Sequence, residues 1–243
     1  MPRKSKKSKR VEETLPNDLE PQLRKKFHVH DMRTYKPLTK NQRTFFDLWD
    51  GTDDHFFLSG FAGTGKTFNA AYLALKDVLD KKYDKVIFIR SATPTKDTGF
   101  LPGTLEEKLA VYEEPYIETF DKFFDFKKSY ENLKKLGKVE FVSSSYLRGV
   151  TFDNAVIVID ECQSMTYHEI FTILTRTGDN SRVIICGDFK QNDLINKRFE
   201  ESCFYDLERL ISNVDSFSRI DFKIEDIVRS KFVKDLIIAD SKL

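Results

Sequence analysis

The first candidate for chemistry is an eight-residue stretch that follows the pattern G-x-x-x-x-G-K-[S/T]. Its residues are Gly60, Phe61, Ala62, Gly63, Thr64, Gly65, Lys66 and Thr67. Backbone N–H groups in such a glycine-rich turn converge on phosphate oxygens, and the following helix directs its positive dipole end to the same point. We therefore predict that all eight residues bind ATP, that Lys66 also contacts the β- and γ-phosphates during catalysis, and that Thr67 ligates Mg²⁺ through its hydroxyl.

A pair of acids forms the second candidate. Asp160 and Glu161 follow residues 155–159, the most continuous apolar run in the chain. Such a run is typical of a buried strand, so the two carboxylates are expected at its exposed end. Downstream of a phosphate-binding loop, this arrangement predicts Asp160 as a Mg²⁺ ligand and Glu161 as the base that polarises the attacking water.

Strands and helices are expected to alternate around these residues. Apolar runs predict strands at 55–58, 86–89, 139–142, 155–159, 182–186 and 216–222, and apolar periodicity predicts helices from about 43, at 68–79, at 104–136, and from 227 onward. This order predicts an α/β fold, a doubly wound and mainly parallel sheet in a single core domain. Ligands bind beyond the carboxyl ends of such strands, where the candidate residues fall.

The predicted helix at 104–136 is dense in aromatic residues. Those near one helical face are Tyr116, Phe120, Phe123, Phe124 and Tyr130. A buried stripe is favoured over an exposed platform for stacking bases. Elsewhere, Thr166 and Glu169 have the spacing of a capping box at a helix start.

Composition and charge restrict the class of protein. The 243 residues carry a net charge of +1, but residues 1–10 hold six basic residues and no acid, so the remainder is net negative. We expect residues 1–37 to form a basic, mostly disordered leader, either an arm for phosphate backbones or a solubilising tail, and residues 38–243 to form the core domain. The three cysteines form no C-x-x-C pair, so the sequence indicates neither a cysteine zinc site nor a disulfide framework. No apolar run nears the roughly 18 residues of a spanning helix, so we expect no membrane partner and a cytoplasmic location.

Several further motifs accompany the loop and the acid pair. They are the Leu-Pro-Gly stretch at 99–103, Tyr-Leu-Arg-Gly at 146–149, Asp-Glu-Cys-Gln at 160–163, Thr-Arg-Thr-Gly at 175–178, Gly-Asp with Gln191 at 187–191, and Ile-Val-Arg at 227–229. Together with the loop, they resemble the PhoH-like family, the phosphate-starvation-inducible type of ATPase found in bacteria and bacteriophages. The resemblance runs from about residue 38 to 239.

That family is similar to the first motor domain of superfamily 1 helicases, which implies a RecA-like P-loop NTPase fold. By this likeness Gln42, placed just ahead of the first helix, would read adenine, and Gln191 would sense the γ-phosphate. Arg148 and residues 143–145 would lie where those helicases touch a nucleic-acid backbone. A phage source would place the protein in the host cytoplasm.

The resemblance therefore implies Mg²⁺-dependent ATP hydrolysis coupled to single-stranded nucleic acid, with RNA favoured and helicase activity as a further option. The alternative is a small-molecule phosphotransferase such as a nucleoside kinase, because thymidine kinases also combine a phosphate loop with Asp-Glu-x-Gln. Those enzymes generally carry a cysteine-rich zinc lobe, which this sequence lacks.

Superfamily 1 motors clamp ATP between two motor domains, and the second domain supplies an arginine to the γ-phosphate. Only about 200 residues follow Gln42, which suffices for one such domain. We therefore expect a homo-oligomeric ring, taken as a hexamer, in which each subunit lends an arginine to its neighbour. Arg229 is the favoured catalytic arginine because it follows a strand end, whereas Arg176 is expected at the far side of the sheet.

Overall fold

A parallel β-sheet organises the part of the chain that the computed structural model describes, residues 27–91, 105–147, 149, 151–188 and 201–241. In these ranges six strands pair in the order β3-β2-β4-β5-β1-β6, and every pairing is parallel. The strands are β1 (His55–Gly60), β2 (Lys85–Arg90), β3 (Val139–Ser143), β4 (Ala155–Ile159), β5 (Arg182–Gly187) and β6 (Phe217–Phe222). The predicted α/β doubly wound sheet is confirmed.

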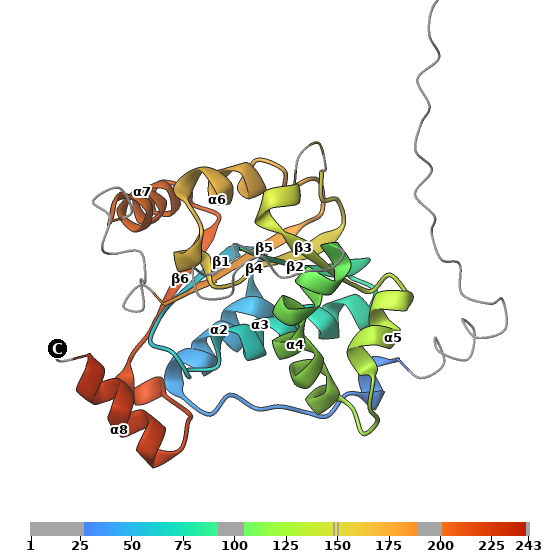
Figure 1. The fold of residues 1–243 in the computed structure, drawn as a ribbon, viewed down its shortest axis with the longest axis horizontal. Helices are drawn as coiled ribbons and strands as arrows, with labels where there is room; N and C mark the ends of the chain where they lie inside the picture. The colour runs from blue at the N-terminus through green and yellow to red at the C-terminus, as the bar shows by residue number, and fades with distance from the viewer. Residues whose placement is uncertain (1–26, 92–104, 148, 150, 189–200, 242–243) are drawn as a thin grey trace, which may run out of the picture.

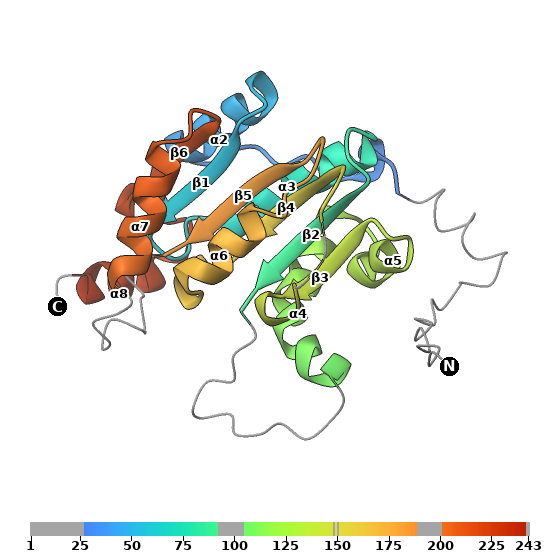
Figure 2. The same cartoon turned by 90° about the horizontal axis from the view of Figure 1, so that it is seen from above.

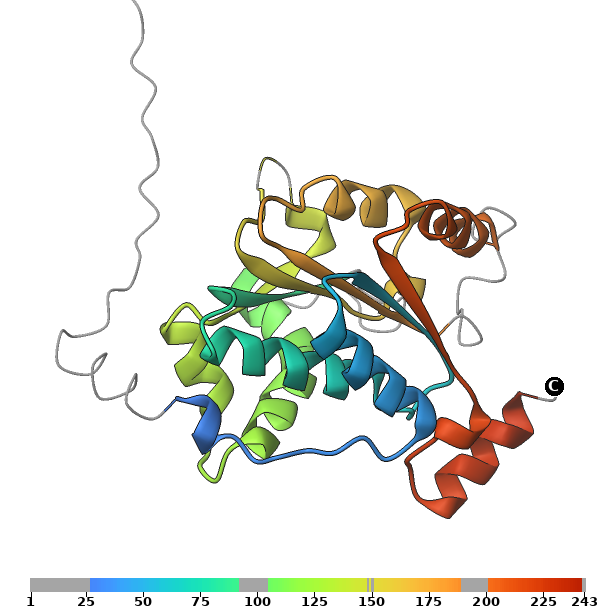
Figure 3. The same cartoon turned by 180° about the vertical axis from the view of Figure 1, so that it is seen from behind.

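Helices cover both faces of this sheet (Figures 1 and 3). One face carries α2 (Lys40–Gly51), α3 (Lys66–Leu79), α4 (Leu105–Phe123) and α5 (Ser129–Lys135), and the other carries α6 (Tyr167–Leu174) and α7 (Glu201–Ser212). The last helix, α8 (Lys231–Asp240), lies outside these layers, near the carboxyl ends of β1 and β6 (Figure 2). Short 3₁₀ turns are η1 (Val29–Asp31), η2 (Ser144–Tyr146), η3 (Cys162–Ser164) and η4 (Ile224–Asp226).

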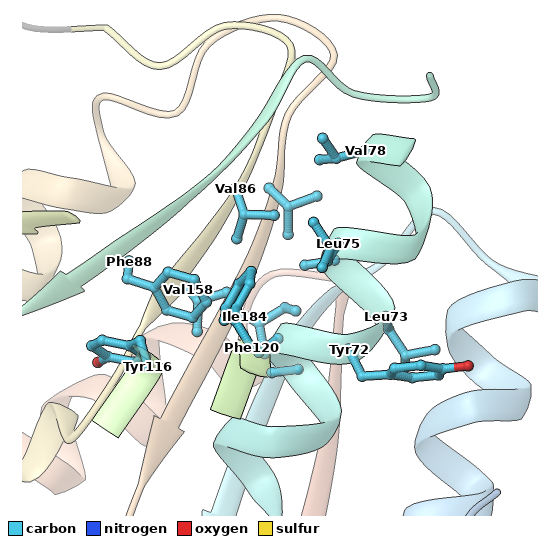
Figure 4. Packing of buried hydrophobic residues seen from close by; sticks show 14 of the residues in the cluster. Tyr72, Leu73, Leu75, Val78, Val86, Phe88, Tyr116, Phe120, Val158 and Ile184 are labelled. Carbon is cyan, nitrogen blue, oxygen red and sulfur yellow. The ribbon is translucent and has the colours of Figure 1, made fainter. Parts of the chain in front are cut away.

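Each strand divides its side chains between two apolar cores. Along β4, Val156 and Val158 belong to the core beneath α2–α5, whereas Ile157 and Ile159 belong to the core beneath α6 and α7. This alternation explains why the run 155–159 is apolar throughout, since both faces of the strand are covered. Figure 4 shows the first core, in which side chains of α3 and α4 meet those of the central strands.

The aromatic stripe of residues 104–136 is buried, as predicted. Its members Tyr116, Phe120, Phe123, Phe124 and Tyr130 all lie in the core beneath α2–α5. Their rings contact one another and their neighbours in edge-on or tilted pairs. These five side chains are therefore not a surface on which bases could stack.

The helices differ from the predictions in several places, since α3 begins at Lys66 rather than 68, α8 begins at Lys231 rather than 227, and the sequence did not predict α7. The helix predicted at 104–136 is two helices, because the chain turns between α4 and α5 at Lys128, whose φ is 63°. The aromatic pattern continues across this turn, so apolar periodicity alone does not reveal it. Gln42 lies inside α2 rather than ahead of it, because the Thr39 hydroxyl accepts the Gln42 N–H and starts the helix before its first buried aromatic residue.

Residues 27–37, which we assigned to the leader, pack against the domain. Phe27 makes edge-on contacts with Phe124 and Phe126, and Tyr35 makes edge-on contacts with rings of α3 and α4. The Arg33 N–H donates to the Phe123 carbonyl at 2.7 Å. We therefore propose that the domain begins by residue 27. Residues 1–26 lie outside the described ranges.

Within the described ranges, none of the helices combines the length and the apolar character that crossing a membrane requires.

Candidate active site

The glycine-rich loop joins β1 to α3 and depends on glycine at three positions. Gly60, Gly63 and Gly65 have φ values of 124°, 73° and 82°, which L-residues with a side chain rarely adopt. A Cβ at Gly60 would also lie 2.0 Å from the carbonyl oxygen of Phe222 on β6. Gly65 then forms the N-cap of α3, so that helix begins at Lys66 and its first N–H groups face the loop.

Lys66 folds back onto its own loop. Its Nζ donates to the carbonyl oxygens of Gly60 at 2.7 Å and Phe61 at 2.8 Å. Burial lowers the pKa of Lys66, and the carboxylate of Asp188 is the strongest influence in the opposite direction. A phosphate would offer this buried ammonium charged acceptors in place of neutral carbonyls, which is a stronger interaction.

The predicted Mg²⁺ ligands meet at the carboxyl edge of the sheet. The Thr67 hydroxyl donates to Asp160 Oδ1 at 2.6 Å, and the Tyr116 hydroxyl donates to Asp160 Oδ2 at 2.8 Å. Burial, and then the adjacent Glu161 carboxylate, raise the pKa of Asp160. Burial likewise raises the pKa of Tyr116, which keeps its hydroxyl protonated as a donor.

These residues fit a magnesium ion. Mg²⁺ is usually held by one or two carboxylates together with substrate phosphates and waters, rather than by a cage of protein ligands. The described residues contain no cluster of three or more His, Cys, Asp or Glu side chains that could form such a cage. Asp160 is a buried carboxylate without a paired cation among its hydrogen-bond partners, and a bound cation would offset the cost of burying its charge.

Glu161 has an unusual backbone and a specific partner. It adopts the left-handed conformation, with φ 51° and ψ 46°, which is strained for a residue with a side chain. The amide of Gln163 donates to Glu161 Oε2, and Gln163 Oε1 accepts the Asp188 N–H at 3.0 Å. Gln163 thus links the predicted base to Asp188, which directly follows β5 and is the last residue of that described segment.

Gln42 lies against the glycine-rich loop. Its Nε2 donates to the Thr64 carbonyl at 2.9 Å, and its Oε1 accepts the Leu38 N–H at 2.8 Å. A primary amide has two N–H donors and two acceptor lone pairs, so one donor and one lone pair of Gln42 remain. These are the groups that an adenine edge would require.

The segment after β6 also reaches the loop. The Val228 N–H donates to the Gly63 carbonyl at 3.0 Å, and a Cβ at Gly63 would lie 2.6 Å from Arg229 Cγ. Arg229 therefore lies against the phosphate-binding loop of its own chain. Arg176 is on the opposite edge, since its carbonyl accepts the N–H of Phe152, three residues before β4 begins.

Other predicted residues are less accessible, or fall outside the described ranges. Ser143 and Ser144 are buried, and the Ser144 hydroxyl donates to Glu169, whereas Ser145 is exposed. The capping box of Thr166 and Glu169 is confirmed. Gln191, Arg148 and the Leu-Pro-Gly stretch at 99–103 lie outside the described ranges.

Two contacts at the site were not predicted from the sequence. The sequence places Tyr116 only in an apolar stripe, and nothing in the spacing distinguishes it from its neighbours. Gln163 belongs to the Asp-Glu-x-Gln motif, but the motif does not predict that its amide links Glu161 to Asp188.

A phosphate-binding loop between β1 and α3, with an acid pair at the end of β4, defines the class of P-loop NTPases. The model of the family described as PhoH-like protein matches residues 34–240, and this chain belongs to that family. A PhoH-like protein of Synechocystis sp. is 33% identical over 187 residues, which cover 76% of this chain and 56% of the relative. The protein PhoH of Escherichia coli is 38% identical over 140 residues, covering 57% of this chain and 40% of that protein.

The chain therefore spans about half the length of the curated relatives it matches. Among solved structures, the large terminase of a thermophilic bacteriophage matches with a TM-score of 0.50 and 13% identity, covering 83% of this chain and 50% of the terminase. A likeness at this identity supports the fold alone.

Proposed function

We propose that this PhoH-family protein hydrolyses ATP with Mg²⁺ and that single-stranded nucleic acid, in the first instance RNA, stimulates the reaction. The observation that supports hydrolysis best is the 2.6 Å hydrogen bond between Thr67 and Asp160, which brings the loop and the acid pair together across 93 residues of sequence. Membership of the PhoH family and the P-loop NTPase fold agree with this assignment.

In the proposed mechanism, Gln42 contacts adenine with its remaining amide donor and lone pair. The Lys66 ammonium would leave the carbonyl oxygens of Gly60 and Phe61 and donate instead to the β- and γ-phosphates. Thr67 and Asp160 hold Mg²⁺, which when bound neutralises charge on the phosphates. Glu161 orients and deprotonates the attacking water, and Gln163 keeps its carboxylate in place.

Arg229 is the proposed positive charge for the γ-phosphate. Its position against Gly63 supports action on the nucleotide of the same chain, whereas the sequence led us to expect action on a neighbouring subunit. Gln191 remains the proposed γ-phosphate sensor, because it follows the last residue of β5 by four positions in the sequence.

The remaining proposals concern partners. We propose a homo-oligomeric ring, with six subunits as the expected number, acting in the cytoplasm on a single strand of nucleic acid that passes the exposed Ser145. Helicase activity would require this hydrolysis to drive movement along the strand. The exposed apolar side chains of α8, beside the loop, support an interface between subunits.

Phosphate release, measured with ATP alone and with RNA, single-stranded DNA or nucleosides added, tests the proposal. We expect turnover that polynucleotides stimulate, that Lys66→Ala abolishes, and that Glu161→Gln lowers by about 10²–10⁴-fold while nucleotide binding persists. Consumption of a nucleoside would indicate a phosphotransferase instead. Turnover by Glu161→Gln at the parent rate would refute the assignment of the base.

A further inference from the structure

Tyr116 makes a contact that core packing does not require. Its hydroxyl is 2.8 Å from Asp160 Oδ2, although the two residues lie 44 positions apart in sequence. The ring packs against side chains of two neighbouring strands, with its centroid 4.5 Å from that of Phe88 on β2 and 5.8 Å from that of Phe141 on β3. Figure 4 shows Tyr116 beside Phe88 in the core beneath α2–α5. The hydroxyl therefore has little freedom to leave the carboxylate.

The Asp160 carboxylate is thereby fixed at both oxygens. Tyr116 on α4 donates to Oδ2, and Thr67 on α3 donates to Oδ1 at 2.6 Å. Both donors come from helices that pack on the same face of the sheet, and both contacts are buried or nearly so. Without the Tyr116 hydroxyl only Thr67 would hold the carboxylate, whose terminal torsion is broad and weakly constrained, so the group could rotate more freely.

We propose that Tyr116 is a positioning residue for the metal site, because by holding Asp160 Oδ2 it fixes the orientation in which Oδ1 lies beside Thr67, the other predicted Mg²⁺ ligand. This inference rests on the proposed Mg²⁺–ATP site and adds a residue to it. Hydrogen-bond partners of ligating carboxylates orient those ligands, and their loss typically costs about 10–100-fold in metal affinity or activity.

The chain provides a matched control. Tyr130 on α5 is equally buried, and its hydroxyl donates to Glu113 Oε2 at 2.9 Å, so it too pairs a phenol with a carboxylate. Glu113 also accepts from Lys134, and neither residue touches the glycine-rich loop or the acid pair in the described contacts. Tyr130→Phe therefore removes the same chemical group without affecting the candidate metal site.

The test is the affinity for a fluorescent, non-hydrolysable ATP analogue, measured with Mg²⁺ and with a chelator. The parent protein should gain affinity when Mg²⁺ is present. In Tyr116→Phe that gain should fall by about tenfold or more, while the affinity in chelator stays unchanged. Tyr130→Phe should match the parent in both conditions. A Tyr116→Phe protein with the full Mg²⁺-dependent gain overturns the inference.

Two further variants separate positioning from simple packing. In an Asp160→Ala background, Tyr116→Phe should have no additional effect, because the acceptor is gone; an undiminished effect would overturn the inference. At position 116, 4-aminophenylalanine retains an N–H donor and should restore the Mg²⁺-dependent gain, whereas 4-fluorophenylalanine of similar size should not. Equal behaviour of these two residues would show that only shape matters. A parent protein that binds no nucleotide would refute the proposed function itself.

Discussion

Gly60 is the last residue of β1 and pairs with Phe222 of β6, so the phosphate-binding loop leaves the sheet where two parallel strands end together. The backbone of β6 lies where a side chain on Gly60 would be, and the φ of 124° excludes an unstrained L-residue. The consensus glycine thus has two roles, since it permits the turn and allows the close approach of the neighbouring strand.

Gly60→Ala should therefore destabilise the fold and weaken nucleotide binding. The strained φ alone costs about 1–3 kcal/mol, and the contact with the Phe222 carbonyl adds to it. Gly51→Ala is the control, because nothing lies within 4 Å of a Cβ at the end of α2, where alanine should be neutral or stabilising by up to about 1 kcal/mol. Urea unfolding measures both. Equal stability of the two variants would contradict the role assigned to the β6 backbone.

Among individual residues, the sequence predicted those that belong to a motif of fixed spacing. It did not predict those that reach the site only through tertiary packing. The loop and the acid pair belong to local patterns, so their positions follow from the chain itself. Tyr116 reaches Asp160 only because α4 packs across β2 and β3, and no local pattern encodes that distance.

The junction of β1 and β5 is held by His55 and Arg182 at the start of these strands. His55 Nδ1 accepts the Val183 N–H at 3.2 Å, and the Arg182 guanidinium donates to the carbonyls of Trp49, Thr52 and Asp54. That guanidinium also lies 3.9 Å from the centroid of the Trp49 ring. Together they join the end of α2 to the strand that leads into the phosphate-binding loop.

This junction should make stability depend on pH. Burial, and then the Arg182 charge, lower the pKa of His55 below its usual 6.5. Below pH 6.5 the unfolded chain therefore binds more protons at this site than the folded one, so stability falls as pH drops through 6.5. The urea midpoint should be lower at pH 5.5 than at pH 7.5. In His55→Asn, whose amide oxygen accepts the same N–H without titrating, the decrease should be smaller, and an equal decrease would contradict this account.

The strands could be predicted from the sequence, whereas the first and last residues of the helices could not. Apolar runs identified all six described strands, because buried parallel strands carry continuous apolar stretches. Helix limits depended on single residues instead: the Thr39 cap starts α2 early, and the left-handed Lys128 separates α4 from α5. The packing of residues 27–37 was missed because Phe27 and Tyr35 are isolated aromatic residues in a polar stretch, without a period to detect.

At the scale of the whole molecule, an apolar surface among the described residues lies uncovered near the candidate site. On and near α8, Phe232 is 71% exposed, Leu236 52% and Val228 40%, and no residue of the helix itself is buried. Exposed apolar side chains gathered on one helix are typical of interaction surfaces. Because Val228 and Arg229 also contact the loop, a subunit that covered α8 would lie next to the nucleotide.

The final prediction concerns how Arg229 works within the proposed ring. Its stem lies on Gly63 of its own chain, so we expect it to serve its own nucleotide. Lys66→Ala and Arg229→Ala should each lose activity alone, and an equal mixture should remain inactive, because every subunit lacks one of the two charges. If Arg229 instead served a neighbour, about a quarter of the sites in randomly mixed head-to-tail rings would be complete and activity would return.

Two measurements make this mixing experiment decisive. Co-purification of an untagged variant with a tagged one shows that subunits have exchanged, and light scattering gives the number of subunits. Phe232→Glu combined with Leu236→Glu should break the ring if α8 forms the interface, since it would place unpaired charges in an apolar contact. A parent protein that is monomeric and fully active would refute the ring. Action of Arg229 within its own chain would then be sufficient, as its contact with Gly63 suggests.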